Sequence, residues 1–331
     1  MRTRHIAFTG LNEVVCETVE QELTAPESGA LVQLSYTCIS AGTEIAKLTG
    51  LQPGNFPVGP LGNRAVGRVI EAGAKRDDLQ PGDFVFCHGP HASHAALPGL
   101  VVKLPDALDR PEMAMLGMAM VAFTGLRVAQ PELGDSAVVI GGGLVGQFAA
   151  QLLQLAGVKV LLVDPVAGRL AIARQCGVEH AIEADGAAEQ VMALTGGQGA
   201  DYILECTGVP AVVEGAVQFA GRSAQLIMIG SPRGELQTDL TAFLNHFHLW
   251  RPQGDLTLKG AHEWKIPLYP ELGSKHSMAR NAHILADLIL ADKLKMKPLL
   301  TGVFKPEDGL GAYERLKNEK ELHLGTVFDW K

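Results

Sequence analysis

The 331-residue sequence predicts an α/β protein with two domains, a doubly wound parallel sheet and a smaller, barrel-like β domain. The length favours two domains, because single hydrophobic cores stop growing at roughly 250–300 residues. Hydrophobic residues make up 47% of the chain and charged residues 19%, which is typical of a globular protein with a large core. The pattern of the sequence also changes after Pro111, from short strand-like segments to alternating strands and helices.

The first part of the chain, residues 1–117, is expected to be β-rich. Its short apolar segments contain β-branched residues and are separated by glycine and proline, which is typical of strands joined by turns. The expected strands are Ala30–Leu34, Ala65–Glu71, Asp83–Cys87 and Val101–Leu104. Their shortness and irregular spacing favour a small barrel.

The second part opens with Met113–Ala129, whose spacing of apolar residues predicts a helix. Beyond it, mostly apolar runs alternate with helix-like segments, a pattern that predicts βαβ units and a parallel sheet with both faces covered. The expected strands are Val138–Ile140, Val158–Val163, Tyr202–Glu205 and Gln225–Ile229, and the expected helices are Leu144–Leu155, Ala167–Gln175, Ala187–Leu194 and Ala211–Phe219. The tail predicts two more helices and a strand: Asn281–Lys293, Pro306–Asn318 and Leu324–Phe328.

Charge and composition argue against several kinds of partner. The 28 Lys+Arg against 36 Asp+Glu give a formal net charge of −8, whereas nucleic-acid-binding proteins normally present a clustered basic face. No stretch reaches the ~18 uninterrupted apolar residues of a membrane helix, and the N-terminus does not resemble a signal peptide. Five scattered cysteines without a CxxC pair are typical of reduced thiols. We therefore expect a cytoplasmic protein that binds neither nucleic acid nor membrane and has no four-cysteine zinc lobe.

The most informative motif is SAVVIGGGLVGQFAAQLL, in which Gly141, Gly143 and Gly146 form G-x-G-x-x-G between an apolar strand and an apolar helix. The first glycine permits a tight turn, the second lets the backbone approach a pyrophosphate, and the third lets the helix pack on the strand. The amides of Leu144 and Val145 at the start of the helix offer N–H donors to the phosphates. A dinucleotide site is predicted, and a turn that only joins strand to helix is the alternative.

The next strand strengthens this prediction because it ends in an acid. Asp164 follows Val158–Val163 at close to the ~20 residues that separate the glycines from a ribose-binding carboxylate. A carboxylate there accepts hydrogen bonds from ribose hydroxyls and repels a 2′-phosphate, so NAD(H) is the expected cofactor. Arg169 is expected near the adenosine edge, with a solvated helix charge as the alternative.

The wider pattern resembles the medium-chain dehydrogenase/reductase superfamily. The similar segments are GDSAVVIGGGLVGQFAAQLLQLAGVKVLLVD and ADYILECTGVP, together with PGDFVF and VVKLPD upstream. The resemblance implies a Rossmann domain at residues 118–262 and a GroES-like catalytic domain formed by residues 1–117 and 263–331, with the active site between them. It also implies that the cofactor site includes Cys206, Thr207, Gly230 and His262. Within the superfamily, AGTE resembles the bacteriochlorophyllide hydroxyethyl dehydrogenases and related sugar or cyclitol oxidoreductases.

The chain departs from this family at the metal ligands. Zinc-binding members carry Cys-Gly-Ser/Thr-Asp and Gly-His-Glu, whereas the corresponding segments here are Ala41-Gly42-Thr43-Glu44 and Gly62-Asn63-Arg64. The third ligand position falls near Met118. A methyl group, an amide and a thioether are poor zinc ligands, so we predict an enzyme without catalytic zinc.

Without a metal, side chains must polarise the substrate oxygen and exchange its proton. Thr43 matches the family's Ser/Thr at the start of the proton relay, and Asn63 is a candidate donor to the substrate oxygen; a turn role is the alternative for both. The residue at the usual relay-histidine position is Ala46. Arg64 and Glu44 are expected to form a structural ion pair.

Two histidine-containing segments are candidates for the acid/base and for cofactor contacts. In CHGPHASH, His88 and His91 are candidates for the acid/base because imidazole titrates near neutral pH, with polar loop residues as the alternative, and His94 is expected in a barrel strand. In LKGAHEWK, His262 and Trp264 are expected near the cofactor or the substrate, or at a subunit interface.

We therefore expect an NAD(H)-dependent oxidoreductase that uses no metal and acts on a secondary alcohol or ketone, such as a polyol, a sugar, a cyclitol or a specialised metabolite. One alternative is a zinc-free enoyl or quinone reductase, although such enzymes usually use NADPH and Asp164 disfavours it. Another is a non-catalytic NAD(H)-binding protein. The family resemblance also implies a homodimer or homotetramer.

Overall fold

The computed structural model describes residues 1–331, and the chain divides into two compact units. One unit comprises Met1–Gly117 and Ile266–Lys331, and the other comprises Met118–Lys265. The second unit is therefore an insertion within the sequence of the first. The boundary expected between residues 262 and 263 falls inside the inserted unit, whose last residue is Lys265.

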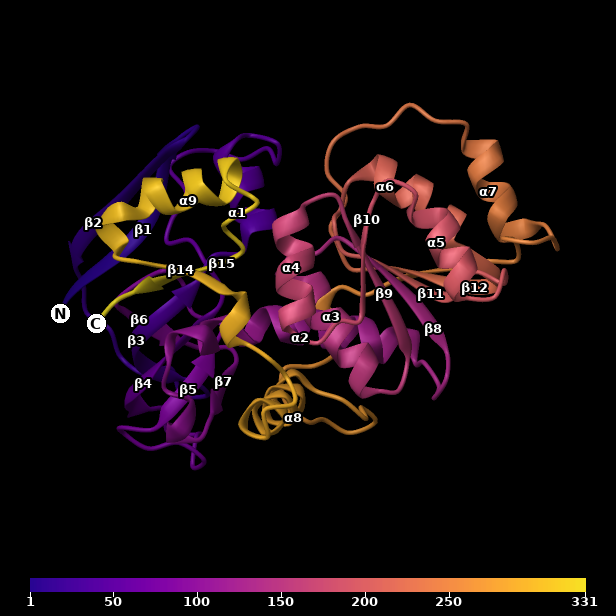
Figure 1. The fold of residues 1–331 in the computed structure, drawn as a ribbon. Coiled ribbons are helices and arrows are strands. Elements are labelled where there is room, and N and C mark those ends of the chain that lie inside the picture. The colour runs from indigo at the N-terminus through magenta and orange to yellow at the C-terminus, as the bar shows by residue number, and fades with distance from the viewer. The chain divides into compact units, whose positions relative to one another are not determined.

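The inserted unit is built on a six-stranded parallel sheet with the order β10-β9-β8-β11-β12-β13 (Figure 1). Its strands are β8 (Ser136–Ile140), β9 (Lys159–Asp164), β10 (His180–Glu183), β11 (Ala200–Glu205), β12 (Ala220–Met228) and β13 (Thr257–Gly260). The first strand, β8, lies between β9 and β11, so the strand order reverses there. In doubly wound sheets, ligands bind at such a switch point, beyond the carboxyl ends of the strands. The α/β fold class predicted from the sequence is confirmed.

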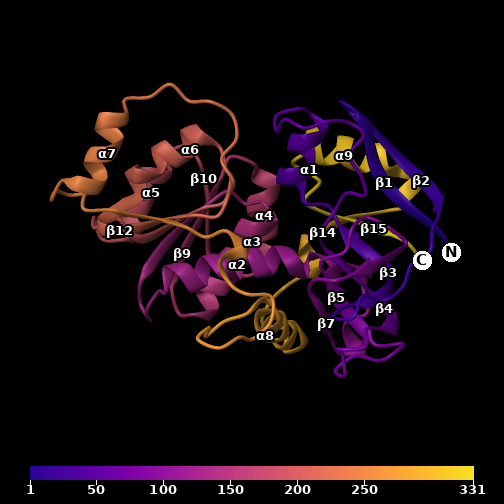
Figure 2. The same cartoon turned by 180° about the vertical axis from the view of Figure 1, so that it is seen from behind.

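Helices connect the strands of this sheet (Figure 2). They are α3 (Leu144–Leu155), α4 (Ala167–Gln175), α5 (Ala187–Leu194), α6 (Pro210–Gly215) with a 3₁₀ turn at Ala216–Phe219, and α7 (Leu240–His248), whereas α2 (Leu116–Ala129) precedes the first strand. The bounds of α3, α4 and α5 agree with the prediction. Side chains from the strands and from α5 form one buried core, in which Val138, Leu161 and Ile203 pack with Val191.

One helical segment, Pro111–Ala129, is long and apolar enough to cross a membrane when judged by length and composition alone. It combines a 3₁₀ turn at Pro111–Met115 with α2. The most apolar 18-residue stretch of this segment is 78% buried inside the protein. Helices in the core of a folded domain can have the same length and apolar composition.

The other unit contains a seven-stranded mixed sheet in the order β14-β15-β3-β4-β5-β7, with β6 also paired to β3. Its strands are β3 (Ala30–Cys38), β4 (Ala65–Ala72), β5 (Phe84–Cys87), β6 (His94–Leu97), β7 (Val101–Lys103), β14 (Leu300–Phe304) and β15 (Gly325–Asp329). A separate hairpin, β1 (Arg2–Gly10) and β2 (Glu13–Glu20), precedes them. The expected strands of residues 1–117 are all present, and His94 begins β6 as predicted.

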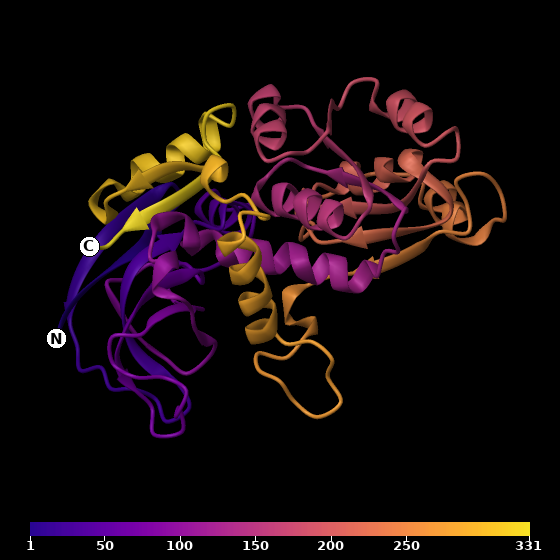
Figure 3. The ribbon, with the colours of Figure 1, turned by 60° about the horizontal axis from the view of Figure 1, so that its bottom comes forward.

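The two ends of the chain meet in this unit. The last strand, β15, pairs with β3, and Figure 3 shows it in yellow beside the indigo N-terminal part. The helices are α1 (Ala41–Leu48), α8 (Met278–Leu290) and α9 (Gly309–Asn318), and α9 lies along β2 (Figure 1). A buried cluster joins residues from both ends, including Ile6, Phe8, Tyr313, Phe328 and Trp330.

The sequence failed to predict the elements that are short or exposed. The residues of β13 are mostly exposed because this strand lies at the edge of its sheet, so it lacks a continuous apolar run. Helix α7 has no buried residue, and α1 lies in a glycine-containing segment for which no helix was predicted. For these elements the propensity signal is weak and tertiary context decides.

Candidate functional site

The three glycines of the motif adopt the geometry that a dinucleotide needs. Gly141 follows β8 with φ +100°, a backbone conformation that only glycine adopts readily. A Cβ on Gly146 would lie 1.8 Å from the carbonyl oxygen of Gly141, so the helix packs directly on the strand. At Gly143, by contrast, an added Cβ would meet nothing within 4 Å. The second glycine therefore faces open space, as a site for phosphate groups requires.

Helix α3 begins at this open position. Its N-cap is Gly143, with no side-chain cap, and Leu144 and Val145 form its first turn. The first amides of a helix have no intrahelical acceptor, and the helix dipole adds a partial positive charge there. Backbone N–H groups, an open approach and a twelve-residue helix fit a pyrophosphate.

Asp164 lies at the end of β9, beside the glycine turn, and is almost fully buried. Its Oδ2 accepts a hydrogen bond from the Gly142 amide at 2.6 Å and lies 3.5 Å from Nη1 of Arg169. Its Oδ1 accepts from the Val166 amide at 2.8 Å. A carboxylate offers about four acceptor positions, so Oδ1 keeps acceptor capacity beyond the Val166 amide, although the Asp164 side chain is only 3% exposed. Arg169 is thus held beside Asp164, and its expected position at the adenosine edge stays a prediction.

The loop after β11 forms the other side of the switch point. Cys206 donates its amide to the carbonyl of Ile140 in β8, at 2.9 Å, and Thr207 contacts Gly141. A Cβ on Gly230 would lie 2.3 Å from the Gly208 amide nitrogen, so the end of β12 passes directly against this loop. Burial and the adjacent Glu205 carboxylate raise the pKa of the Cys206 thiol, which is therefore neutral at physiological pH.

Glu205 organises this loop, and the sequence analysis did not single it out. It ends β11, is fully buried, and accepts hydrogen bonds from the amides of Thr207 and Gly208 and from the Thr207 hydroxyl. An acid at the end of an otherwise apolar strand, like Asp164 in β9, was the available signal. Its carboxylate fixes the backbone at the carboxyl end of the sheet.

His262 lies just after β13, and its side chain is exposed. Trp264, two residues later, is 58% exposed. Neither the cofactor role nor the interface role expected for this segment is tested by the geometry of the inserted unit alone. Both stay predictions.

The catalytic candidates lie on three segments of the other unit. Thr43 is half-buried in the first turn of α1, so it belongs to a helix rather than to a turn. Asn63 is exposed in the connection that precedes β4. His88 follows β5, is half-buried, and meets Phe86 edge-to-face with the ring centroids 6.2 Å apart.

The structure corrects the prediction for His91. The residue is fully buried, and both ring nitrogens are engaged: Nδ1 lies 2.7 Å from Thr37 Oγ1 and Nε2 lies 2.9 Å from Glu44 Oε2. A buried imidazole with no free nitrogen cannot exchange a proton with a substrate. His91 is a core residue of its unit, packed edge-to-face on Phe328.

Glu44 has buried partners that the sequence did not predict, and its expected ion pair with Arg64 stays a prediction. Glu44 pairs with His91 and accepts further hydrogen bonds from the Tyr313 hydroxyl and from the Ser40 amide. Burial raises the pKa of Glu44, but His91 and these donors outweigh the burial, so its pKa lies below the usual value. Arg64 packs its stem against Gly117, where a Cβ would lie 1.8 Å from the arginine Cδ.

The residues at the family's zinc positions do not fit a zinc ion. Ala41 begins α1 with a methyl side chain, Asn63 offers an amide, and Met118 is a buried thioether in α2. Zinc in proteins is held by thiolate, imidazole and carboxylate ligands. Nor do His, Cys, Asp and Glu form any group of three or more that could hold a metal ion elsewhere in residues 1–331.

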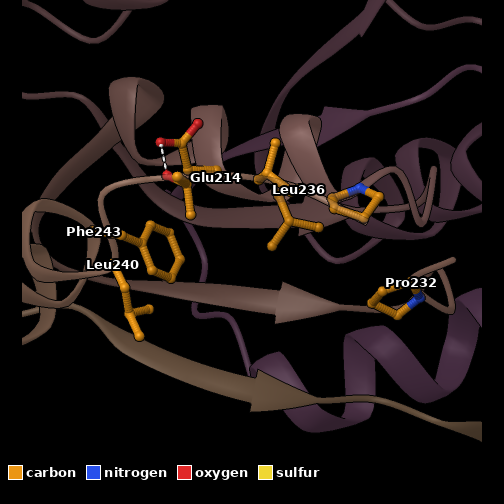
Figure 4. A pocket seen from close by; sticks show the side chains of 8 residues that line it. Glu214, Pro232, Leu236, Leu240 and Phe243 are labelled. Atoms are coloured by element: carbon orange, nitrogen blue, oxygen red, sulfur yellow. Dashed lines mark hydrogen bonds between the residues drawn. The ribbon is translucent and has the colours of Figure 1, made fainter. Parts of the chain in front are cut away.

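The inserted unit also contains an apolar pocket of about 200 Å³ between α6, the segment after β12, and α7 (Figure 4). Leu236, Leu240 and Phe243 contribute its apolar side chains. Its polar pair, Thr238 and Glu214, is bonded internally, with the hydroxyl donating to the carboxylate at 2.8 Å. Apart from this pair the lining is apolar, and none of the catalytic candidates predicted from the sequence lies in it.

Comparisons with known proteins agree with this architecture. The family model described as "Zinc-binding dehydrogenase" matches residues 145–268. A D-guloside 3-dehydrogenase of Escherichia coli is 34% identical over 292 residues, which span 84% of this chain and 79% of the relative. A D-xylulose reductase of Saccharomyces cerevisiae is 23% identical over 236 residues, 69% of this chain and 60% of the relative.

Solved structures show the same fold across the whole chain. Galactitol-1-phosphate dehydrogenase from Escherichia coli superposes with a TM-score of 0.81 at 20% identity, covering 98% of this chain and 99% of the other. Benzyl alcohol dehydrogenase from Acinetobacter calcoaceticus gives a TM-score of 0.81 at 18% identity, covering 99% of each.

Proposed function

Because this chain belongs to the medium-chain dehydrogenase/reductase superfamily, we propose that it transfers a hydride between NAD(H) and a secondary hydroxyl or ketone of a sugar or polyol, without zinc. The chain is thus an oxidoreductase, and the proposal concerns its coenzyme, its substrate and its metal independence. The observation that carries the redox chemistry is the open glycine turn at Gly143 beside the ribose-side carboxylate of Asp164.

The coenzyme proposal rests on the charge at Asp164. A 2′-phosphate would meet a buried carboxylate that already accepts two backbone amides and cannot turn away. The negative charges of the carboxylate and of a 2′-phosphate would repel each other, so NAD(H) is favoured over NADP(H). The 3.5 Å contact with Arg169 reduces this repulsion but leaves the ribose-side Oδ1 negative.

The substrate proposal rests on the relatives. The D-guloside 3-dehydrogenase relative is named for oxidation of one ring position of a glycoside, and other relatives are named for D-xylulose and sorbitol. We propose that a ring hydroxyl of a hexoside is the group oxidised here. No relative among these is named as an enoyl or quinone reductase, so that alternative gains no support.

The mechanism proposed uses hydrogen-bond donors where zinc members use a Lewis acid. Thr43 would hold the substrate oxygen and pass on its proton, Asn63 would donate its amide to the same oxygen, and His88 would exchange the proton with solvent. All three side chains belong to one unit and are at least partly exposed. Ala41, Asn63 and Met118 leave no ligand set for zinc.

We also propose a cytoplasmic homodimer or homotetramer. The support is that the inserted unit exposes Leu240 and Leu244 of α7 and Leu258 of β13, and that β13 lies at the edge of its sheet. Light scattering on the purified protein would measure the oligomer, and a monomer at micromolar concentration would contradict this proposal.

One experiment tests the central proposal. The purified protein is incubated with NAD+ or NADP+ and a panel of hexosides, polyols, simple alcohols and enones, with its metal content measured on the same sample. We expect turnover of a glycoside or polyol with NAD+ that persists after dialysis against a chelator. Activity that appears only with stoichiometric zinc, or only on enones with NADPH, would overturn it.

A further inference from the structure

A line of buried polar groups crosses the unit that carries the catalytic candidates. The indole Nε1 of Trp330 donates to Thr37 Oγ1 at 2.9 Å, and Thr37 Oγ1 lies 2.7 Å from His91 Nδ1. His91 Nε2 meets Glu44 Oε2 at 2.9 Å, and the Tyr313 hydroxyl donates to the same oxygen. None of the five side chains is more than 5% exposed. They come from β3, α1, the loop after β5, α9 and the C-terminus.

The chemistry of these groups fixes the hydrogen-bond direction at the two ends of the line. An indole only donates and an ionised carboxylate only accepts, so Thr37 accepts from Trp330, and Glu44 accepts from His91 Nε2. Between Thr37 Oγ1 and His91 Nδ1 the direction depends on the state of the imidazole. Both ring nitrogens are engaged in either case, so His91 serves as a fixed connector between these groups.

The backbone of His91 holds a second segment. Its amide donates to the carbonyl of Leu61 at 2.5 Å. Gly62 has φ +85° and lies against the imidazole, because a Cβ added there would be 2.8 Å from the ring atoms Cγ and Cδ2. Contact with the ring and positive φ both require glycine at position 62. The next residue along this segment is Asn63.

We propose that His91 is the positioning residue of the active site, because it joins α1 to the Leu61–Asn63 segment. Two of the former ligand positions, Ala41 and Asn63, stand on these two segments. Through Glu44, His91 fixes the first turn of α1 and hence Thr43. Through Leu61 and Gly62 it fixes the backbone that carries Asn63. The inference rests on the proposed function for its catalytic consequence, whereas the physical coupling of the segments can be tested without any substrate.

The coupling predicts that loss of the imidazole loosens both segments together. In His91→Phe, the Glu44 carboxylate loses its ion-pair partner and the two segments lose their common contact. In His91→Gln, the side-chain amide can still donate a hydrogen bond to Glu44, so α1 is expected to keep most of its order. Tyr313→Phe removes a single hydrogen bond to the same carboxylate while keeping the ring packed on Phe8.

Hydrogen–deuterium exchange measured by mass spectrometry on the full-length protein tests this without coenzyme or substrate. We expect His91→Phe to raise exchange in residues 41–48 and 61–64 together, His91→Gln to restore protection of 41–48, and Tyr313→Phe to raise exchange mainly in 41–48. His94→Phe is the matched control, because His94 lies in the same part of the chain and contacts neither segment; it should leave both unchanged. Parent-like exchange in both His91→Phe and Tyr313→Phe, or a rise in only one segment in His91→Phe, would overturn the proposal. If His91→Phe does not fold, Tyr313→Phe and His91→Gln still decide it.

Kinetic measurements then distinguish a positioning role of His91 from a role in stability alone. With a substrate found in the panel, His91→Phe is expected to lower kcat about a hundredfold at a temperature where it is fully folded, because small displacements of reacting groups cost that much. The dissociation constant for NADH should stay within about twofold of the parent value, since the coenzyme groups lie on the other unit, and His91→Gln should recover most of the loss in kcat. A parent-like kcat in folded His91→Phe would overturn the catalytic part. An inactive parent protein would instead contradict the proposed function and leave the exchange result standing.

Discussion

The two units present their functional groups in opposite ways. In the inserted unit the backbone carries the site: a bare glycine turn, the first amides of α3, and two buried carboxylates, Asp164 and Glu205, whose main partners are backbone amides. In the other unit we propose that side chains carry it, positioned by the buried hydrogen bonds of His91. A backbone site tolerates almost no change of residue type at the glycines, whereas a side-chain site can lose its metal ligands and be held by another network.

The largest effect on coenzyme binding is expected from substitutions in the glycine turn of the inserted unit. Gly146→Ala places a methyl group 1.8 Å from a backbone oxygen, so we expect misfolding of the turn and loss of NADH binding by more than about a hundredfold. Gly143→Ala is the matched variant, because its methyl group meets no protein atom. It should keep the parent melting temperature and still weaken NADH binding, measured by titration calorimetry. Normal binding by Gly143→Ala would mean that the phosphates do not approach this backbone.

On the side-chain unit, Thr43→Val should reduce kcat by about a hundredfold, as is usual when a group in proton exchange is lost. Valine has nearly the same shape, so α1 and the NADH dissociation constant should be unaffected. Thr43→Ser keeps the hydroxyl and should recover activity. A fully active Thr43→Val would remove Thr43 from the mechanism and leave His88 and Asn63 as the candidates.

A smaller effect is expected at the ribose position. Asp164→Ala should weaken NAD+ binding about tenfold, because it removes the ribose acceptor and leaves the amides of Gly142 and Val166 without one. Asp164→Asn should change the choice of coenzyme more than the affinity, raising the ratio of NADP+ to NAD+ use. Coenzyme competition assays measure both, and an unchanged ratio would show that the charge does not select the coenzyme.

The smallest effect concerns the pH dependence of stability. The folded state holds the pKa of Glu44 below its usual value, so ionised Glu44 adds stability that is fully present above the unfolded pKa of about 4.3 and is lost as the pH falls through the folded pKa. We expect Glu44→Gln to melt below the parent at pH 7, and the difference in melting temperature to narrow as the pH is lowered below about 4.3. A difference that is the same at pH 7 and pH 3.5 would show that the carboxylate charge contributes nothing.

The sequence predicted the backbone-based site of the inserted unit better than the side-chain groups of the other unit. Local sequence was enough for the glycine turn, Asp164 and the bounds of α3, because each depends on residues that are near neighbours along the chain. It was not enough for Glu205, whose three donors are visible only once the loop is folded. For His91 the sequence supplied an imidazole near a pocket-lining motif, and an acid/base role was predicted. That prediction was wrong because His91 is buried, and the sequence of a polar loop does not show which of its side chains are buried.

By itself, the sequence determined the fold class, the dinucleotide motif and the absence of zinc-type ligands at three positions. These depend on periodicity and residue type, which are properties of short segments. Only the tertiary structure decided what occupies the interior behind the catalytic candidates. Thr37, Glu44, His91, Tyr313 and Trp330 are far apart in the chain, so only the folded protein brings them together. Trp330, for example, reaches Thr37 because β15 pairs with β3 and places the C-terminus beside residues from the first third of the sequence.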